Sequence, residues 1–255
     1  MLNYIRAEFY KVFHRRSYLL ITLAVVLGLE GLLVAGWVFT NAHGNHIDFY
    51  TGAGMLCTML KIGFYGTLLT CDMVFAAQYK HSTLKNEVSF GLPRNRIYFG
   101  KFIVQLVMSI LFCVVMAVFY LGLCWLTLYH DPEMDRIAME LVGYCLLTAL
   151  PLWIGVQAAV CACFFFLKSD LAASFAAVGI FEVAAVVLEV ASLFNTPLKG
   201  TLQVLHEHMP TVMLGNAPQV AGDWAFCGKA WIVGAVWFVV FTALGMYGFR
   251  KKEIK

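Results

Sequence analysis

Residues 102–129 read FIVQLVMSILFCVVMAVFYLGLCWLTLY, a run of 28 residues without a charged side chain. About 20 apolar residues in a helix cross the hydrocarbon core of a bilayer, so this run predicts a transmembrane helix. Working outward from it, comparable apolar segments occur at about 18–39, 54–77, 140–167, 171–192 and 229–249. We therefore expect an all-α integral membrane protein with six transmembrane helices.

The composition of the whole chain agrees with this fold class. Of 255 residues, 61% are hydrophobic and 13% are charged, whereas soluble domains have about 45–50% apolar and about 25% charged residues. The polar segments between the spans are too short for a soluble catalytic domain, and no phosphate-binding loop of the form G-x-x-x-x-G-K-[ST] is present. We expect one transmembrane domain over residues 1–255, and any ATP must be bound by another chain.

The basic residues test the six-span assignment, because cytoplasmic loops retain Lys and Arg. Of the 18 basic residues, one side carries only Arg136, Lys199 and Lys229, and Lys61 lies within a span. This asymmetry predicts that both termini are cytoplasmic. The other side carries Arg6, Lys11, Arg15, Arg16, Lys80, Lys85, Arg94, Arg96, Lys101, Lys168, Arg250, Lys251, Lys252 and Lys255.

The segment before the first span, residues 1–17, has an amphipathic pattern. Its basic residues Arg6, Lys11 and Arg15 lie away from an apolar helical face, and Arg16 follows them. We expect an interfacial helix in the cytoplasmic headgroup region; the alternative is a solvated helical tail. The apolar face consists of Leu2, Ile5, Phe9, Val12 and Phe13.

The loop at 78–101 carries the most informative polar sequence. Ser82 or Thr83 can cap a short helix, and Gly91 with Pro93 ends it. Leu84 and Val88 share one face of this helix. A basic helix between two spans is either an anchor on anionic lipid or a docking element for a cytoplasmic partner.

The same loop resembles that of the permease subunits of type II ATP-binding-cassette exporters. Thr83-Leu84-Lys85-Asn86, Arg94, Ile97-Tyr98 and Lys101 match the family pattern in order and spacing. Gln78 stands where Glu is usual and Ser82 where Gly is usual, which puts in doubt a charge-dependent role at position 78. The amphipathic N-terminal helix, the six spans and the basic C-terminal end also fit this family.

The resemblance implies that residues 81–91 form a coupling helix that seats in an ATPase subunit, with an N-terminal elbow helix beside it. Lys85, Asn86 and Glu87 would be the polar face of that contact. Closure of two ATPase subunits, which bind ATP and Mg²⁺, would then rock the spans. The coupling residues implied are Thr83, Leu84, Lys85, Asn86, Glu87, Val88 and Arg94, and the elbow residues are Arg6, Lys11, Arg15 and Arg16.

The resemblance also implies a non-catalytic subunit of the bacterial cytoplasmic membrane that forms a homodimer and holds no cofactor itself. Small permeases of this layout resemble those that export membrane-active peptides, such as lantibiotics and phenol-soluble modulins, or confer immunity to them. We expect a hydrophobic or amphipathic substrate, most simply such a peptide, and no nucleic acid.

Five ionisable residues fall within the predicted spans, namely Glu30, Lys61, Asp72, Glu182 and Glu189. Each should face protein or a water-filled cavity, because a charge facing lipid costs at least about 2–3 kcal/mol. Their depths permit an ion pair of Lys61 with Glu189 or Glu30. Two interpretations stay open for them: a polar patch on a translocation cavity or a structural interhelical pair. The buried charges also leave a secondary transporter or channel driven by an ion gradient as the alternative function.

The segment 193–228 is too long for a simple turn. Leu198, Leu202, Leu205 and Met209 recur on one helical face, and the resemblance implies short re-entrant helices that form an extracellular gate. His206-Glu207-His208 within it does not have the i, i+4 histidine spacing of a helical zinc motif. We therefore expect a solvated helix tip there and no metal site.

Overall fold

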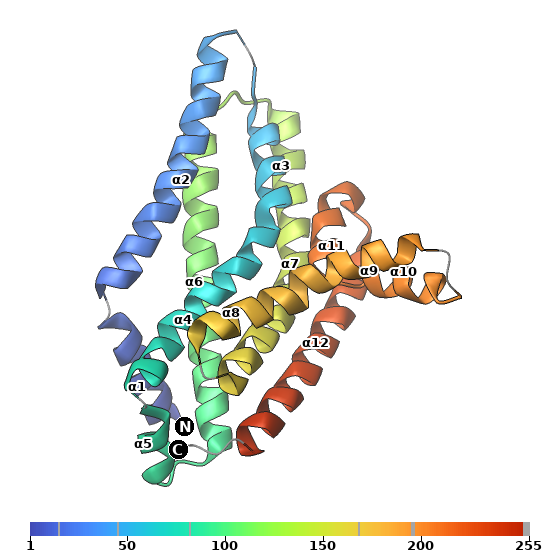
Figure 1. Cartoon of the computed structure of the whole chain (residues 1–255). Coiled ribbons are helices and arrows are strands. Elements are labelled where there is room, and N and C mark those ends of the chain that lie inside the picture. The colour runs from blue at the N-terminus through green and yellow to red at the C-terminus, as the bar shows by residue number, and fades with distance from the viewer. Residues whose placement is uncertain (15, 45, 82, 168, 195–196, 252–255) are drawn as a thin grey trace.

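The computed structural model describes residues 1–14, 16–44, 46–81, 83–167, 169–194 and 197–251, without the side chains of 16–19, 76–81 and 83. Within these ranges the chain is helical, and its one β-bridge joins Asp48 to Tyr129. Six helices among the described residues are long and apolar enough to cross a membrane (Figure 1). The predicted all-α membrane fold with six transmembrane helices is confirmed.

The elements follow one another as membrane spans joined by short polar pieces. The six spans are α2, α3 with η1 and α4, α6, α7, α8 with η2 and α9, and α12. Their bounds are α1 Leu2–Phe13, α2 Arg16–Ala42, α3 Phe49–Met59, η1 Leu60–Ile62, α4 Gly63–His81, α5 Thr83–Ser89, α6 Arg94–Thr127, α7 Pro132–Phe166, α8 Asp170–Val178, η2 Gly179–Val183, α9 Ala184–Leu193, α10 Lys199–Glu207, α11 Pro210–Asn216, η3 Ala217–Val220 and α12 Trp224–Lys251.

Helix α7 is the centre of the bundle. Of its most apolar 18-residue window, 78% is buried, more than in any other described span. It packs against α12 through Gly155 and Gly234, and a Cβ atom on Gly155 would lie 2.9 Å from the carbonyl oxygen of Gly234. Small residues at such a crossing let two helix backbones approach closely, which is how helices associate in lipid.

The α-helical geometry of two spans is interrupted by an irregular turn, and a side chain from a neighbouring helix donates a hydrogen bond to each of these turns. The second span narrows to a 3₁₀ turn at Leu60–Ile62, where the indole of Trp153 donates a hydrogen bond to the Leu60 carbonyl oxygen (3.2 Å). The fifth span widens to a π turn at Gly179–Val183, where the Thr211 hydroxyl donates to the Phe181 carbonyl oxygen (2.9 Å). Partners of this kind satisfy backbone groups that an irregular helix leaves free.

The spans α6 and α7 are longer than predicted. Their 34 and 35 residues correspond to about 51 and 52 Å, whereas the hydrocarbon core is about 30 Å thick. The apolar segments predicted from 102 and 140 belong to helices that begin earlier, at Arg94 and Pro132. A hydropathy window does not detect polar helical turns that continue a span beyond the membrane.

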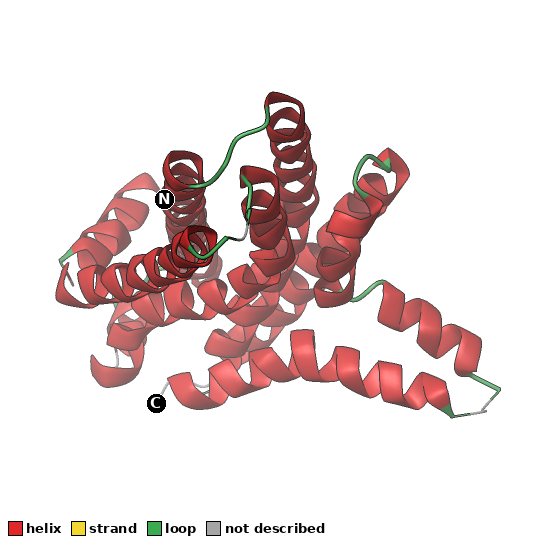
Figure 2. Cartoon of the chain, turned by 90° about the horizontal axis from the view of Figure 1, so that it is seen from above, coloured by secondary structure: helices red, strands yellow, loops and turns green. Residues whose placement is uncertain are grey.

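The fifth span and the segment after it lie at the side of the bundle (Figures 1 and 2). Helices α8 and α9 lean away from the other spans, and α10 folds back along α9. The predicted short helices in 193–228 are present as α10 and α11, although α10 ends before Met209. An apolar groove of about 530 Å³ lies between α9 and α10, lined by Val186, Val187, Val190, Ala191, Phe194, Leu198 and Leu202.

Candidate functional site

Four elements meet at the end of the bundle that carries most of the basic residues, and we call this end the base. They are α1, α5, the start of α6 and the end of α12 (Figure 1). The short helix α5 ends because Gly91 adopts a left-handed conformation (φ +79°), which glycine tolerates at no steric cost. Pro93 then precedes the first turn of α6. The predicted stop at Gly91 and Pro93 is confirmed.

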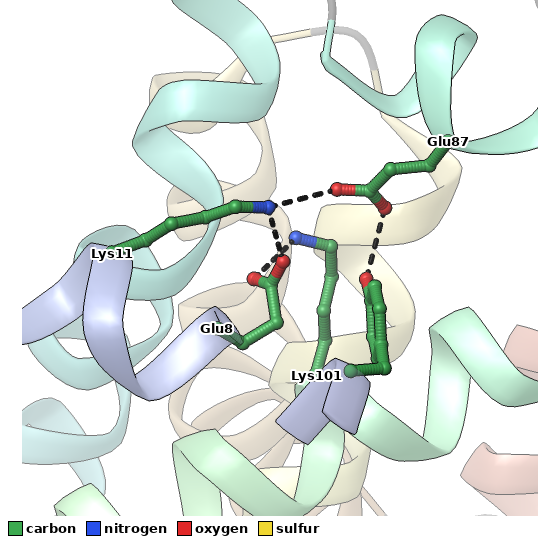
Figure 3. Close-up of polar contacts among 5 residues, drawn as sticks. Glu8, Lys11, Glu87 and Lys101 are labelled. Atoms are coloured by element: carbon green, nitrogen blue, oxygen red, sulfur yellow. Dashed lines mark hydrogen bonds and ion pairs between the residues drawn. The ribbon is translucent and has the colours of Figure 1, made fainter. Parts of the chain in front are cut away.

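Five side chains from α1, α5 and α6 form one chain of polar contacts, which we call the base network (Figure 3). Lys101 Nζ on α6 lies 3.0 Å from Glu8 Oε2 on α1. Lys11 Nζ contacts both Glu8 Oε1 and, at 3.1 Å, Glu87 Oε1 on α5. The Tyr4 hydroxyl donates to Glu87 Oε2 at 2.9 Å. The network thus connects the N-terminal helix, the loop helix and the third span.

The ion pair at the centre of the network is shielded from solvent. Glu8 is 1% exposed and Lys101 is 2% exposed, and the Lys101 ammonium lies 5.4 Å from the centre of the Phe75 ring. Two carboxylates and two ammonium groups balance formally, which burial of charge requires. Burial raises the pKa of Glu8, but the charges and hydrogen bonds of Lys101 and Lys11 outweigh it, so that the net pKa lies below its ordinary value.

Tyr4 fits into the network because α6 has a glycine opposite it. A Cβ atom on Gly100 would overlap the Tyr4 ring, so the ring can pack against α6 only because residue 100 has no side chain. Burial, followed by the negative charges of Glu8 and Glu87, raises the pKa of the Tyr4 phenol far above its usual range. The phenol therefore keeps its proton and donates a hydrogen bond to the Glu87 carboxylate.

A second set of contacts ties the start of α6 to the end of α12. Arg94 Nη1 donates to the carbonyl oxygens of Phe249 and Arg250, each at 2.6 Å, and its guanidinium stacks over the Phe249 ring. The Arg250 guanidinium in turn donates to Asn95 Oδ1. A cation near the last carbonyls of a helix is favourable, because those groups lack partners within the helix and carry partial negative charge.

Comparison with known families identifies the type of protein. The sequence profile of the ABC-2 family transporter protein matches residues 4–189, which include the whole base network. This chain belongs to the ABC-2 transporter family. It is the transmembrane subunit of an ABC transporter, and its partner is an ABC ATPase carried on a separate subunit. Neither the curated proteins nor the solved structures gave a match.

In this ABC-2 subunit, α5 has two distinct faces. Leu84 is buried and Val88 is partly buried against the core, which confirms the predicted shared face. Lys85 and Asn86 are exposed, and Phe90 just beyond the helix is 87% exposed. Glu87 was grouped with Lys85 and Asn86, but the structure turns its carboxylate inward to α1. Ser82 and the side chain of Thr83 lie outside the described residues.

Helix α1 lies beside the start of α6, and the bundle covers only part of its predicted apolar face. Phe9 and Val12 pack against the bundle, whereas Leu2 and Phe13 are exposed. Arg6 is exposed, in agreement with a headgroup-facing position. Lys11 belongs to the base network. The predicted elbow residues Arg15 and the side chain of Arg16 lie outside the described residues.

The five charges within the spans do not form a single site. In the described part of the chain, no ion pair links Lys61 to any of the three glutamates. Lys61 is exposed in the 3₁₀ turn, and Glu189 is exposed on α9. Glu30 is half-buried on α2, and Glu182 lies in the π turn near Tyr65. Asp72 is half-buried on α4 and has a partner of its own.

The sequence interpretation missed Glu8 and Tyr4 and took Lys101 only as a motif position. Tyr4, Glu8 and Lys11 occur at i, i+4 and i+7, which places them on one helical face. A lone acidic residue in a basic segment was the available signal. Its partners could not be inferred, since Lys101 is 93 residues away in sequence.

Proposed function

We propose that this ABC-2 subunit exports a hydrophobic or amphipathic substrate, namely a membrane-active peptide, and that two ATPase subunits drive it. The observation that carries the proposal is the arrangement of α5. Its inner face is held by Leu84 and Glu87, while Lys85, Asn86 and Phe90 remain exposed at the base. A short helix whose inner face packs against its own chain and whose outer face is exposed is suited to bind a partner protein. This proposal assigns that outer face to the ATPase.

The proposed orientation places the base in the cytoplasm of a bacterium, with both termini on that side. Lys85, Arg96 and Arg250 are exposed there, and such an excess of basic residues is typical of cytoplasmic loops. Helices α10 and α11 would then lie toward the outside and act as the gate. The exposed apolar surface of α1 would rest in the headgroup region of the inner leaflet.

The proposed docking face of α5 combines one large apolar side chain with two polar ones. Phe90 would fill a pocket of the ATPase, since exposed aromatic residues are frequent anchors at protein interfaces. Lys85 and Asn86 would contact the polar rim. ATP and Mg²⁺ would be bound by the ATPase, and closure of its two copies would move α5 and the spans attached to it between two states.

The proposed substrate and assembly rest on the apolar character of the chain and on the resemblance. The groove between α9 and α10 is lined only by apolar residues, as a site for aliphatic and aromatic side chains of a peptide would be. We propose a homodimer, because two ATPase subunits offer two sites for α5 and one chain has one such helix.

The test asks whether a gene adjacent to that of this chain encodes an ABC ATPase, co-purifies the two proteins and measures ATPase activity in lipid vesicles. We expect a stable complex whose activity rises with a membrane-active peptide, and loss of complex formation in Lys85→Glu and Phe90→Ala. Arg136→Glu is the matched control, because Arg136 is exposed at the opposite end. A complex that forms equally well with all three variants would contradict the assigned docking face. Stimulation by lipid-linked glycans but not by peptides would contradict the substrate class.

A further inference from the structure

We propose that Glu87 is a positioning residue that clamps α5 to the elbow helix, so that force on α5 reaches α6 through α1. This inference rests on the proposed docking of an ATPase on α5. In a simple linkage, α5 would transmit motion only along the chain, into α4 before it and α6 after it. The base network adds a lateral connection through side chains, from Glu87 to Lys11 and Tyr4 and from Glu8 to Lys101 (Figure 3).

The first step of the argument is that α5 has few other supports. It has seven residues, and among its described side chains the inward apolar contacts are those of Leu84 and Val88. Two apolar side chains one turn apart define an axis about which so short a helix can roll. Glu87 has two bonds to α1, and hydrogen bonds are directional. These two bonds oppose the roll that the apolar contacts permit.

The second step is that α1 itself is fixed to α6 at adjacent positions. The Tyr4 ring rests against Gly100, and the Glu8 carboxylate pairs with Lys101. The pair is almost completely buried, and separating it would leave the Lys101 ammonium without its counterion and Glu8 with the partly exposed Lys11. Helix α1 therefore moves together with the start of α6. Glu87 then connects α5 to this two-helix unit.

The third step separates this role from a direct contact with the ATPase. Glu87 is 9% exposed, and both of its carboxylate oxygens are engaged within the chain. The adjacent Lys85 and Asn86 are exposed and have the outward direction that a partner needs. Loss of the Glu87 charge should therefore leave ATPase binding intact and reduce the response of the ATPase to substrate.

The test uses the full complex in lipid vesicles and measures two quantities, the affinity for the ATPase subunit and the substrate-stimulated ATPase rate. We expect Glu87→Gln and Tyr4→Phe to bind the ATPase within twofold of the unchanged protein. We expect their stimulated rate to fall roughly fivefold, within the range found for residues that couple two sites. Glu133→Gln, at an exposed position on α7, should change neither quantity.

Lys11 supplies a matched pair of variants for rescue. Its side chain is 43% exposed, so an arginine can be accommodated there. Lys11→Arg should keep the stimulated rate because it retains a cation between Glu8 and Glu87, whereas Lys11→Met should lose it. Equal loss in both would indicate a packing role and would overturn the proposal. Loss of ATPase binding in Glu87→Gln would instead make Glu87 a direct contact, which also overturns it.

A measurement without the ATPase distinguishes failure of the clamp from failure of the proposed function. Spin labels at Arg6 on α1 and Asn86 on α5, both exposed, report the distance between the two helices in the free chain. We expect a narrow distance distribution that broadens in Glu87→Gln and Lys11→Met but not in Lys11→Arg. An unchanged distribution in all variants would refute the clamp. If the distribution broadens but no ATPase binds, only the proposed function fails.

Discussion

Replacing Lys101 by Met should destabilise the chain by leaving the Glu8 carboxylate without its buried partner. Removing one partner of a buried ion pair costs about 3–5 kcal/mol. Glu8 keeps its contact with Lys11, whose side chain is 43% exposed, so this neighbour compensates only part of the loss. We therefore expect Lys101→Met to lower the free energy of unfolding by about 2–3 kcal/mol, at or just below the lower limit of that range.

The converse change, Glu8→Gln, should be at least as costly. It removes the carboxylate that faces the buried Lys101 ammonium, which keeps its contact with the Phe75 ring at 5.4 Å. We expect a loss of about 3–5 kcal/mol. The double variant removes both charges, so its loss should be smaller than the sum of the two single losses. Residues in one ion-pair network typically show interaction energies of about 0.5–3 kcal/mol, and here we expect at least about 1.5 kcal/mol.

The assay is reversible unfolding in lipid–detergent micelles with increasing denaturing detergent, followed by tryptophan fluorescence for the unchanged chain, the two single variants and the double variant. Glu133→Gln is the control, since substitutions at exposed sites usually change stability by no more than about 0.5 kcal/mol. Additive losses, within about 0.5 kcal/mol, would refute the argument that Glu8 and Lys101 stabilise one another.

Three further predictions concern other parts of the bundle. Hydrogen bonds to the Trp125 carbonyl oxygen and to a nearby carboxylate raise the pKa of His130 above its ordinary value of 6.5. The stabilisation by these bonds is complete below pH 6.5 and is lost as the pH rises through the raised pKa. Hydrogen exchange at residues 128–131, corrected for its intrinsic rate, should therefore be faster at high pH, and slower exchange there would contradict the prediction. Gly234→Ala should destabilise the folded chain by about 1–3 kcal/mol, because its Cβ atom would overlap the backbone of α7. Gly228→Ala is the control, since a Cβ atom there meets open space. Equal effects of the two substitutions in unfolding titrations would disprove the close crossing of α7 and α12. Gln105 is fully buried, and among the described residues its amide has the Cys71 thiol as a polar neighbour but no partner at ordinary hydrogen-bond distance. Gln105→Leu should therefore leave stability unchanged or raise it. A loss above about 2 kcal/mol would show that the contact with Cys71 stabilises the bundle.

The spans could be predicted because their signal is local. An apolar run of about 20 residues has few alternatives to a transmembrane helix, and all six expected spans are present. The signal for the end of α5 is equally local, since the left-handed conformation of Gly91 and the ring of Pro93 both determine the backbone at their own positions. Sequence reasoning succeeded wherever a residue and its immediate neighbours determine the structure.

The interrupted spans and the base network depend instead on distant partners. The turn at Leu60–Ile62 contains no proline, and the indole that holds it comes from Trp153 on another helix. The inward direction of Glu87 follows from Lys11, 76 residues earlier. In a seven-residue helix, the apolar pattern of Leu84 and Val88 fixes one face but leaves the direction of a neighbouring carboxylate open.

The polar character of the base network follows from its place at the edge of the membrane. Apolar contacts between helices gain little in lipid, because lipid tails solvate apolar side chains as well as other side chains do. Apolar contacts also allow one helix to slide along another, because they have no preferred direction. Ion pairs and hydrogen bonds have defined directions and lengths, and they hold α1, α5 and α6 in one register. A buried ion pair is often no more stabilising than apolar packing of equal volume, so the advantage of Glu8 and Lys101 lies in orientation. A short helix that transmits force, as we propose for α5, needs a fixed orientation more than it needs additional stability.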